Sequence, residues 1–243
     1  MDSGFVKVRV YESADQEAVL RIFHEGMIGL VPQGTFAVYS VAAGPLAAAC
    51  LTAAAVLHKV IGVKGVPSAA AGIVAFGGAM AYLWRLMRGA MVAYANDQLS
   101  KDLRDIPGYY LCRADTHFWV AVDSFDTVVG CVALDSPVRD PADGAPPAQC
   151  PTKYLAEPHF GELRRMSVSS AARGRGVALA LHAELERFAR AKGLGGIFLR
   201  TSSMQHAAVA LYRKVGYTLV SQRPIPVPIL GAAIKHLEFC KDF

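Results

Sequence analysis

The sequence predicts an α/β fold with a hydrophobic helical hairpin inserted into it, and three observations carry this prediction. Short apolar or alternating runs recur along the chain and are typical of strands. Amphipathic helical spacing follows the first such run and returns after a glycine-rich turn. Between the first helix and the remaining strands lie two long runs without charge. With 243 residues, the chain is long enough for one substantial domain with an appendage.

In the first half of the chain, predicted strands and helices of the α/β fold lie on both sides of the hairpin. We expect the inserted hairpin at residues 30–91. Around it the sequence predicts a strand at Phe5–Tyr11, a helix at Asp15–Glu25, an amphipathic helix at Asn96–Ile106, and paired strands at His117–Val122 and Thr127–Leu134.

The second half begins with a proline-rich loop, residues 135–158, because Ser136–Pro158 holds six of the thirteen prolines. Beyond it we expect strands at Glu162–Val168 and Ile197–Ser202, joined by a helix that starts near Val177. Thr218–Val220 and Lys235–Cys240 are the expected last strands.

Two uncharged runs within the hairpin predict membrane insertion. Phe36–Leu57 and Gly65–Trp84 each reach about 20 residues, the length that spans a bilayer core. Because predicted strands of the α/β fold lie on both sides of the hairpin, both of its ends must emerge on one side of the membrane. That allows two spans or a re-entrant hairpin. Arg85 and Arg88 after the second run favour the cytoplasm for that side.

Charge and cysteine content narrow the classes of partner. The net charge of +5 suits an anionic cofactor and a membrane surface. No basic stripe with interleaved aromatic residues indicates nucleic acid. The five cysteines show neither metal-ligand spacing nor an even disulfide framework, so we expect no metal site.

The most informative segment is the turn between the predicted strand at 162–168 and the helix that follows. Gly174 and Gly176 permit backbone conformations that side chains hinder. The free N–H groups of the helix N-terminus favour an anion such as a diphosphate. Arg173 and Arg175 add positive charge. An ordinary strand-to-helix turn with solvated arginines is the alternative.

The surrounding motifs resemble those of a known family. Arg-x-x-Gly-x-Ala at 173–178 is similar to the coenzyme-A-binding signature of the GNAT N-acetyltransferase superfamily. Gln205, Ala208, Leu211, Tyr212 and Gly216-Tyr217 fit its Asn-x-x-Ala-x-x-Leu-Tyr-x-x-x-Gly-Phe/Tyr segment, with Gln in place of the usual Asn.

Further segments resemble one group within this superfamily. Glu162-Leu-Arg-Arg-Met-Ser-Val-Ser-Ser, Asp105-Ile-Pro-Gly-Tyr-Tyr110 and Phe118-Trp-Val-Ala-Val122 are similar to the N-acetyltransferase 8 (camello-like) group, which includes aspartate N-acetyltransferase. The resemblance implies a mixed, mostly antiparallel sheet flanked by helices. It also implies acetyl-CoA as co-substrate and an endoplasmic reticulum setting, with mitochondrial association as the alternative.

The resemblance also implies roles for individual residues. Glu162 is the expected general base and Tyr212 the expected general acid for the departing thiolate. A carboxylate that only pairs with Arg164 or Arg200, and a half-buried helix aromatic, are the structural alternatives. The expected contacts to acetyl-CoA come from Met166, Val168, Arg173, Gly174, Arg175, Gly176, Val177, Ala178 and Gln205.

The acceptor is expected to be a primary amine that attacks the thioester directly. Arg164 and Arg200 could hold a substrate carboxylate, which favours a small amino acid or a cysteine S-conjugate over a protein lysine. Strand alternation places Arg164 and Arg165 on opposite faces, and Arg165 is expected to be solvated. A catalytically idle scaffold that binds acetyl-CoA is the competing hypothesis. No oligomeric state is predicted.

Overall fold

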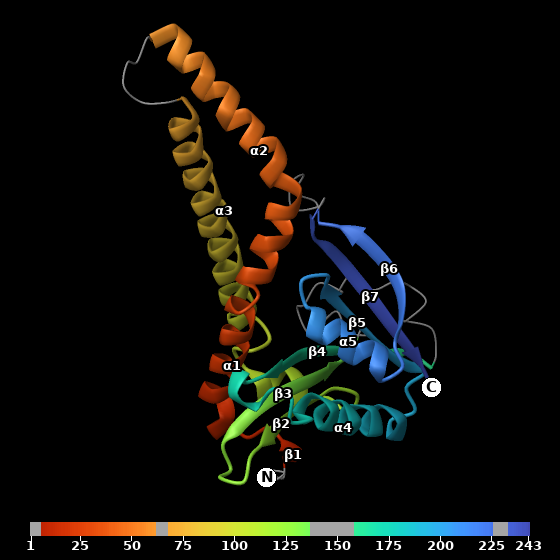
Figure 1. Ribbon diagram of the computed structural model, residues 1–243. Coiled ribbons are helices and arrows are strands. Elements are labelled where there is room, and N and C mark those ends of the chain that lie inside the picture. The colour runs from red at the N-terminus through yellow and green to blue at the C-terminus, as the bar shows by residue number, and fades with distance from the viewer. Residues whose placement is uncertain (1–5, 62–67, 137–157, 226–232) are drawn as a thin grey trace.

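The computed structural model describes residues 6–61, 68–136, 158–225 and 233–243. Its centre is a seven-stranded sheet with the order β1-β2-β3-β4-β5-β7-β6 (Figure 1). Only β4 and β5 run parallel, so the sheet is mixed and mostly antiparallel, as the sequence predicts. The strands are β1 Lys7–Val10, β2 His117–Val122, β3 Val128–Asp135, β4 Phe160–Val168, β5 Gly196–Ser202, β6 Thr218–Pro224 and β7 Lys235–Asp242.

Helices cover both faces of the sheet. The α-helices are α1 Gln16–Ile28, α2 Val31–Ile61, α3 Ser68–Leu99, α4 Val177–Ala191 and α5 His206–Lys214. On one face, the α4 side, Leu181 and Leu185 pack against Trp119 of β2 and Leu199 of β5. On the other face, the α1 side, Phe23 packs against apolar residues of β2 and β3. A sheet with two apolar faces therefore carries two separate cores.

The hairpin consists of α2 and α3, which project away from the sheet and pack against each other (Figure 1). The Tyr39 hydroxyl of α2 donates to the Met80 carbonyl of α3 at 2.5 Å. At the base, Met87 packs with Val31 and with Met204 of the β5–α5 turn. Beyond this base most side chains are exposed. By length and composition, the helical stretches Ser13–Val56 and Ala70–Leu99 could each cross a membrane.

Two sequence-based expectations concern residues 96–106 and 135–158. The separate helix expected at Asn96–Ile106 is wrong: α3 runs on to Leu99, and a series of turns follows. Here the chain turns so that Asp102, Leu103 and Ile106 become buried. The proline-rich loop expected at 135–158 lies almost entirely outside the described residues, although Asp135 still belongs to β3.

Candidate active site

The glycine turn opens directly into α4, as the sequence predicts. Gly174 and Gly176 have φ of 76° and 80°, in the left-handed region where glycine carries no steric penalty. A Cβ atom at either position would meet no atom within 4 Å, so the backbone of the turn faces open space. Among the described residues, the N–H groups of 174–178 donate no backbone hydrogen bond. The result is an accessible cradle of unpaired donors at a helix N-terminus.

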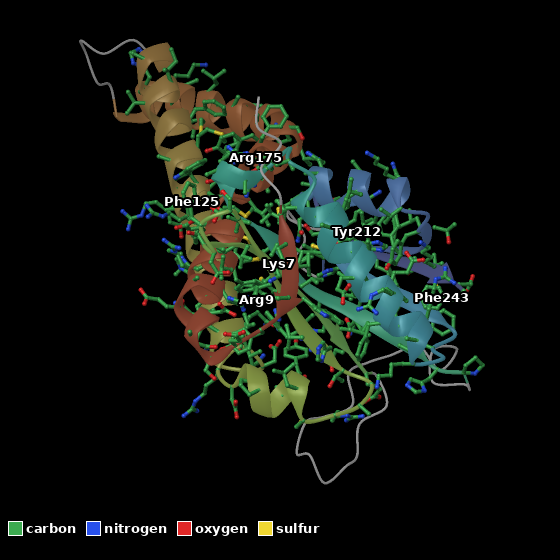
Figure 2. The ribbon with its side chains drawn as sticks, turned by 90° about the horizontal axis from the view of Figure 1, so that it is seen from below. Lys7, Arg9, Phe125, Arg175, Tyr212 and Phe243 are labelled. Carbon is green, nitrogen blue, oxygen red and sulfur yellow. The ribbon has the colours of Figure 1, made fainter. Side chains whose placement is uncertain are left out.

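The arginines of this turn are both exposed. Arg173 donates from Nε to the Val168 carbonyl at 3.4 Å, a weak contact that ties it to the end of β4. Arg175 lies in the turn that leads from β4 into α4 (Figure 2). Both side chains are exposed beside the cradle, and the weak bond of Arg173 leaves its other guanidinium N–H groups available to an anion.

Strands β4 and β5 separate beside this turn. Their parallel pairing runs from Phe160–Gly196 to Leu163–Leu199, and no further pair joins them within the described chain. From Arg164 onward, β4 remains bonded to β3 only, while β5 remains bonded to β7. The separation therefore begins before Met166 and Val168, two of the residues expected to contact acetyl-CoA. Met166 and Val168 line its α4 side as partly buried side chains.

A β-bulge in β4 lies at the start of this separation. The register with β3 shifts between Cys131 and Ala133, where two β4 residues oppose one. Arg165 occupies the bulge with φ 57°, which costs a non-glycine residue about 1–2 kcal/mol. The bulge interrupts strand alternation, so Arg164 and Arg165 both turn toward the α1 side. The expectation that they lie on opposite faces is wrong for this reason.

Glu162 lies on the α1 side of β4 and pairs with Arg200 of β5. Its Oε1 accepts from Nε and Nη2 of Arg200 at 3.1 and 2.9 Å. The carboxylate is buried, whereas the Arg200 side chain is 40% exposed. One of the two structural alternatives for Glu162 is therefore present. Both bonds use Oε1, however, and Oε2 has no hydrogen-bond partner among the described residues.

Arg164 lies on the same face and is held by β3. Its Nη1 donates to Oδ2 of Asp135 at 2.6 Å and to the Tyr109 hydroxyl at 3.3 Å. Its side chain is half-buried. Glu162, Arg164 and Arg200 are thus brought to one face, but Arg200 is the more exposed of the two cations.

Arg165 is not solvated, contrary to expectation. Its guanidinium donates to both carboxylate oxygens of Asp102, and the bond from Nε to Oδ2 is 2.7 Å long. It also donates from Nη2 to Oε1 of Gln98 at 2.7 Å. The Tyr110 hydroxyl donates to the same carboxylate. Burial opposes ionisation of Asp102, but the bonds from Arg165 and the charges of Arg165 and Arg164 outweigh it and lower its pKa.

Tyr212 lies on α5 (Figure 2) and belongs to the core on the α4 side of the sheet, whereas Glu162 lies on the α1 side. Its ring packs against Tyr217 and Phe239, and 5% of the residue is exposed. Burial raises the pKa of its hydroxyl above the ordinary value, which keeps it protonated at neutral pH. Because they lie on opposite faces of the sheet, Glu162 and Tyr212 can reach the same substrate only through the separation between β4 and β5.

Sequence reasoning missed Thr201, which also borders the separation. It follows Arg200 on β5 and pairs in register with Leu237, so its side chain lies on the α4 side with Tyr212. The residue is 8% exposed, and its hydroxyl has no hydrogen-bond partner among the described residues. Gln205, four residues on, occupies the N-cap position of α5, but its side chain forms no capping hydrogen bond. A threonine in a strand carries no sequence signal for this environment.

Comparison with known proteins agrees with the geometry. Residues 81–217 match the sequence profile of the Acetyltransferase (GNAT) family. This is more than half of the chain, and it includes the separated strands, the glycine turn and α5. The protein therefore belongs to the GNAT acetyltransferase family.

Relatives in sequence carry two kinds of name. N-acetylaspartate synthetase of Danio rerio is 30% identical over 218 residues, which are 89% of this chain and 68% of the relative. The protein of that name from Rattus norvegicus is 29% identical over 222 residues, 87% of this chain and 62% of the relative. N-acetyltransferase 8 of Mus musculus is 38% identical over 136 residues, 56% of this chain and 53% of the relative. The chain thus spans only part of their length.

Solved structures confirm the fold. A GCN5-related N-acetyltransferase from Kribbella flavida superposes with a TM-score of 0.53 at 18% identity, covering 98% of both chains. A Salmonella typhimurium protein solved with its cofactor acetyl-CoA gives a TM-score of 0.50 at 14% identity, covering 98% of this chain and 94% of that one. At these identities the likeness shows the architecture alone.

Proposed function

We propose that the protein is a membrane-anchored N-acetyltransferase that moves an acetyl group from acetyl-CoA to a primary amine in a ternary complex. The observation that carries this proposal is the separation of β4 and β5 beside the glycine cradle, with Glu162 on one face and Tyr212 on the other. An amine can reach the separation from the α1 side, and a thioester can lie within it.

The residues present fit acetyl-CoA. The cradle at 174–178 offers unpaired N–H groups to a diphosphate, flanked by Arg173 and Arg175. The unpaired edges of β4 and β5 offer backbone groups to a pantetheine arm, and the Thr201 hydroxyl is a buried group that needs a partner. When bound, acetyl-CoA supplies an activated thioester. Met166, Val168 and Gln205 are the further proposed contacts.

Glu162 is the proposed base. A lysine-type amine has a pKa of about 10.4 in water, so it must lose a proton before it can attack. Oε2 of Glu162 can accept that proton while Oε1 stays bonded to Arg200. This division of the two oxygens lets one carboxylate serve both an ion pair and proton transfer.

Tyr212 is the proposed acid. It donates its proton to the departing thiolate as the bond between sulfur and the acetyl carbon breaks. Because burial keeps the hydroxyl protonated, the acid is ready at neutral pH. Backbone N–H groups exposed where β4 leaves β5 can stabilise the oxyanion that forms on the acetyl carbonyl.

Arg200 favours an acceptor that carries a carboxylate. It is the exposed cation beside the proposed base, whereas Arg164 is already occupied by Asp135. A carboxylate on Arg200 would place a nearby amine against Glu162. We therefore favour a small amino acid or a cysteine S-conjugate. The names of the N-acetylaspartate synthetases agree with an acidic amino acid. A protein lysine is the second candidate.

The test is an assay of purified protein in detergent with acetyl-CoA and a panel of amines: aspartate, a cysteine S-conjugate, a lysine peptide and an amine without a carboxylate. Tyr212→Phe and Glu162→Gln should each lower turnover about 100- to 10,000-fold with little change in acetyl-CoA affinity. Arg200→Gln should raise KM only for acceptors with a carboxylate. Acetyl-CoA binding without transfer to any amine would favour the idle scaffold instead.

The anchor is proposed from α2 and α3. They have 31 and 32 residues, so each is about 46–48 Å long. Core helices of a soluble enzyme would be buried, whereas the apolar stretches here are mostly exposed. The family resemblance favours the endoplasmic reticulum, with mitochondria as the alternative. Arg85 and Arg88 favour a cytoplasmic catalytic domain.

A carbonate or high-salt wash tests the anchor, because salt screens surface charge but does not release buried apolar segments. The protein should stay in the membrane pellet. Protease added to sealed vesicles should cleave both the N-terminal and the catalytic regions. Opposite protection of the two regions would exclude the hairpin topology, and shared protection would reverse the orientation.

A further inference from the structure

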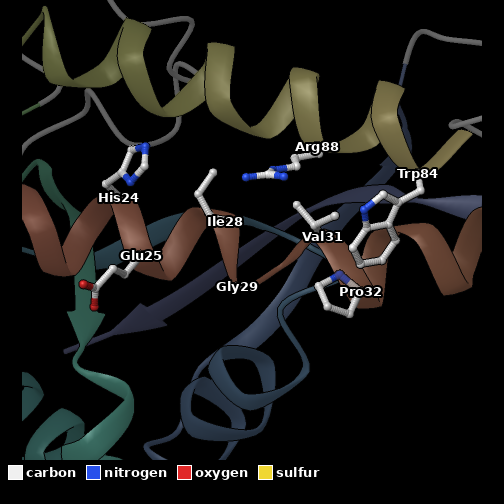
Figure 3. Close-up of a pocket in the computed structure, with 8 residues that line it drawn as sticks. All are labelled: His24, Glu25, Ile28, Gly29, Val31, Pro32, Trp84 and Arg88. Carbon is white, nitrogen blue, oxygen red and sulfur yellow. The ribbon is translucent and has the colours of Figure 1, made fainter. Parts of the chain in front are cut away.

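A cavity lies away from the proposed active site, where the junction of α1 and α2 passes under α3 (Figure 3). Its volume is about 510 Å³. None of the proposed catalytic or acetyl-CoA-binding residues lines it. The lining residues are His24, Glu25, Ile28, Gly29, Val31, Pro32, Trp84 and Arg88.

The cavity lies at the border between charged and uncharged sequence in both helical segments. His24 and Glu25 directly precede the uncharged run of residues 26–57. Arg88 lies just beyond the uncharged run of residues 65–84, which ends at Trp84. With the hairpin inserted, this border is the boundary between water and lipid. Tryptophan is enriched at that depth because its ring is amphipathic.

Two of the polar side chains that line the cavity, Arg88 and His24, point into the space between α3 and α1 (Figure 3). In the same view the Glu25 carboxylate of Figure 3 points away from α3. Arg88 forms no ion pair within the described chain. A cation without a partner that faces a cavity is matched by an anion.

The remaining lining is apolar. Ile28, Val31 and Pro32 form one wall, and the exposed indole of Trp84 lies opposite Pro32 (Figure 3). A free inorganic phosphate would leave this surface unused. A molecule with an anionic head and an apolar chain would use both parts, and its chain could continue along the exposed surface of α2 and α3.

We propose that the cavity binds one phospholipid by its phosphate, an inference that rests on the proposed membrane anchor. Arg88 and His24 hold the phosphate, and the glycerol and first methylene groups pack on Ile28, Val31 and Trp84. Such a lipid would fix the angle between α1 and the hairpin. It would therefore set how the enzyme body sits on the membrane surface.

Arg85 provides the matched control, because it carries the same charge on the same helix but does not line the cavity. Delipidated protein in a neutral detergent would be titrated with dioleoyl phosphatidic acid, dioleoyl phosphatidylcholine or inorganic phosphate, and bound lipid counted by native mass spectrometry. Wild type and Arg85→Gln should each retain one phosphatidic acid. Arg88→Gln should bind it about tenfold more weakly or worse, the loss of one charge-assisted bond.

A second variant tests the cavity without changing charge. Ile28→Trp fills the space and should also abolish retention of the lipid. Equal losses in Arg85→Gln and Arg88→Gln, undiminished binding in Ile28→Trp, or competition by millimolar phosphate would each overturn the proposal. The titration is done in detergent, so its result is independent of the carbonate wash: a protein that leaves the membrane pellet contradicts the anchor but not the phosphate site.

Discussion

Asp102 and Arg165, 63 residues apart in sequence, form a buried ion pair that joins the turns after α3 to the bulged strand of the proposed active site. Gln98, near the end of α3, is uncharged, and its side-chain oxygen accepts a hydrogen bond from the same guanidinium. The pair holds Arg165 in its left-handed conformation. The position of α3 and the course of β4 are thus mechanically linked.

The first prediction concerns this pair. Asp102→Asn would leave the Arg165 charge buried without a counter-charge, so the free energy of unfolding should fall by about 3 kcal/mol or more. Asp97→Asn is the matched control, because Asp97 pairs with Lys101 at 2.6 Å on the surface. It should cost less than about 1 kcal/mol. Denaturant unfolding in detergent measures both, and equal losses would contradict a structural role for the buried pair.

The same pair shows where sequence reasoning ends. The order of strands and helices, the glycine turn and the mixed sheet follow from local patterns and the family resemblance, and the structure confirms them. The bulge at Arg165 does not follow, because its partner Asp102 lies far away in sequence. Strict alternation therefore gave the wrong face for Arg165. The turns at 100–105 were missed for the same reason, since burial of Asp102 and Leu103 outweighs helical periodicity.

In the candidate active site too, some residues could be predicted from local sequence and others could not. The cradle residues could be predicted because glycine spacing before a helix is local information. The pairing of Glu162 with Arg200 was one of two alternatives, and only the register of β4 against β5 decides between them. Thr201 could not be found from sequence, because its significance is the lack of a partner in three dimensions.

The second prediction concerns the cradle. Gly176→Asp would add a side chain and a negative charge where a diphosphate should bind, and it should abolish coenzyme A binding in calorimetry. Gly193→Asp is the control: Gly193 has φ 70° at the other end of α4 and equally open surroundings. Both variants should lose about 1–2 kcal/mol of stability from backbone strain. Only Gly176→Asp should lose binding, and coenzyme A affinity equal to wild type in that variant would refute the cradle.

The third prediction concerns Thr201. Thr201→Val keeps the shape but removes a buried hydroxyl without a partner, so the free protein should become more stable by about 1 kcal/mol. If the hydroxyl bonds to acetyl-CoA, KM for acetyl-CoA should rise about 3- to 10-fold at the same time.

Thr218→Val is the contrasting variant for Thr201. The Thr218 hydroxyl donates to the Cys240 carbonyl at 3.2 Å, so its removal should lower stability by about 1 kcal/mol and leave KM unchanged. Thermal unfolding and steady-state kinetics separate the two outcomes. A Thr201→Val protein with wild-type KM and kcat would show that the hydroxyl takes no part in binding.

The fourth prediction concerns acid stability. His182 on α4 is buried beside the Tyr217 hydroxyl, with 3.2 Å between Nε2 and Oη. Burial lowers the pKa of His182 to about 4, although the nearby Glu186 opposes this. In the unfolded chain an ordinary histidine has a pKa of about 6.5. Between these values the unfolded state binds more protons than the folded state, so stability should fall as the pH drops from about 6.5 toward 4.

The size of this effect follows from the two pKa values. A difference of between two and three pH units corresponds to roughly 3 kcal/mol, lost progressively over that interval. His182→Gln cannot be protonated, so its unfolding free energy should depend less on pH in this range. His206→Gln, at an exposed histidine of α5, should keep the wild-type slope. Unfolding by denaturant at pH 7, 6, 5 and 4 measures the three slopes. If His182→Gln loses as much stability as wild type on acidification, His182 is not the group responsible.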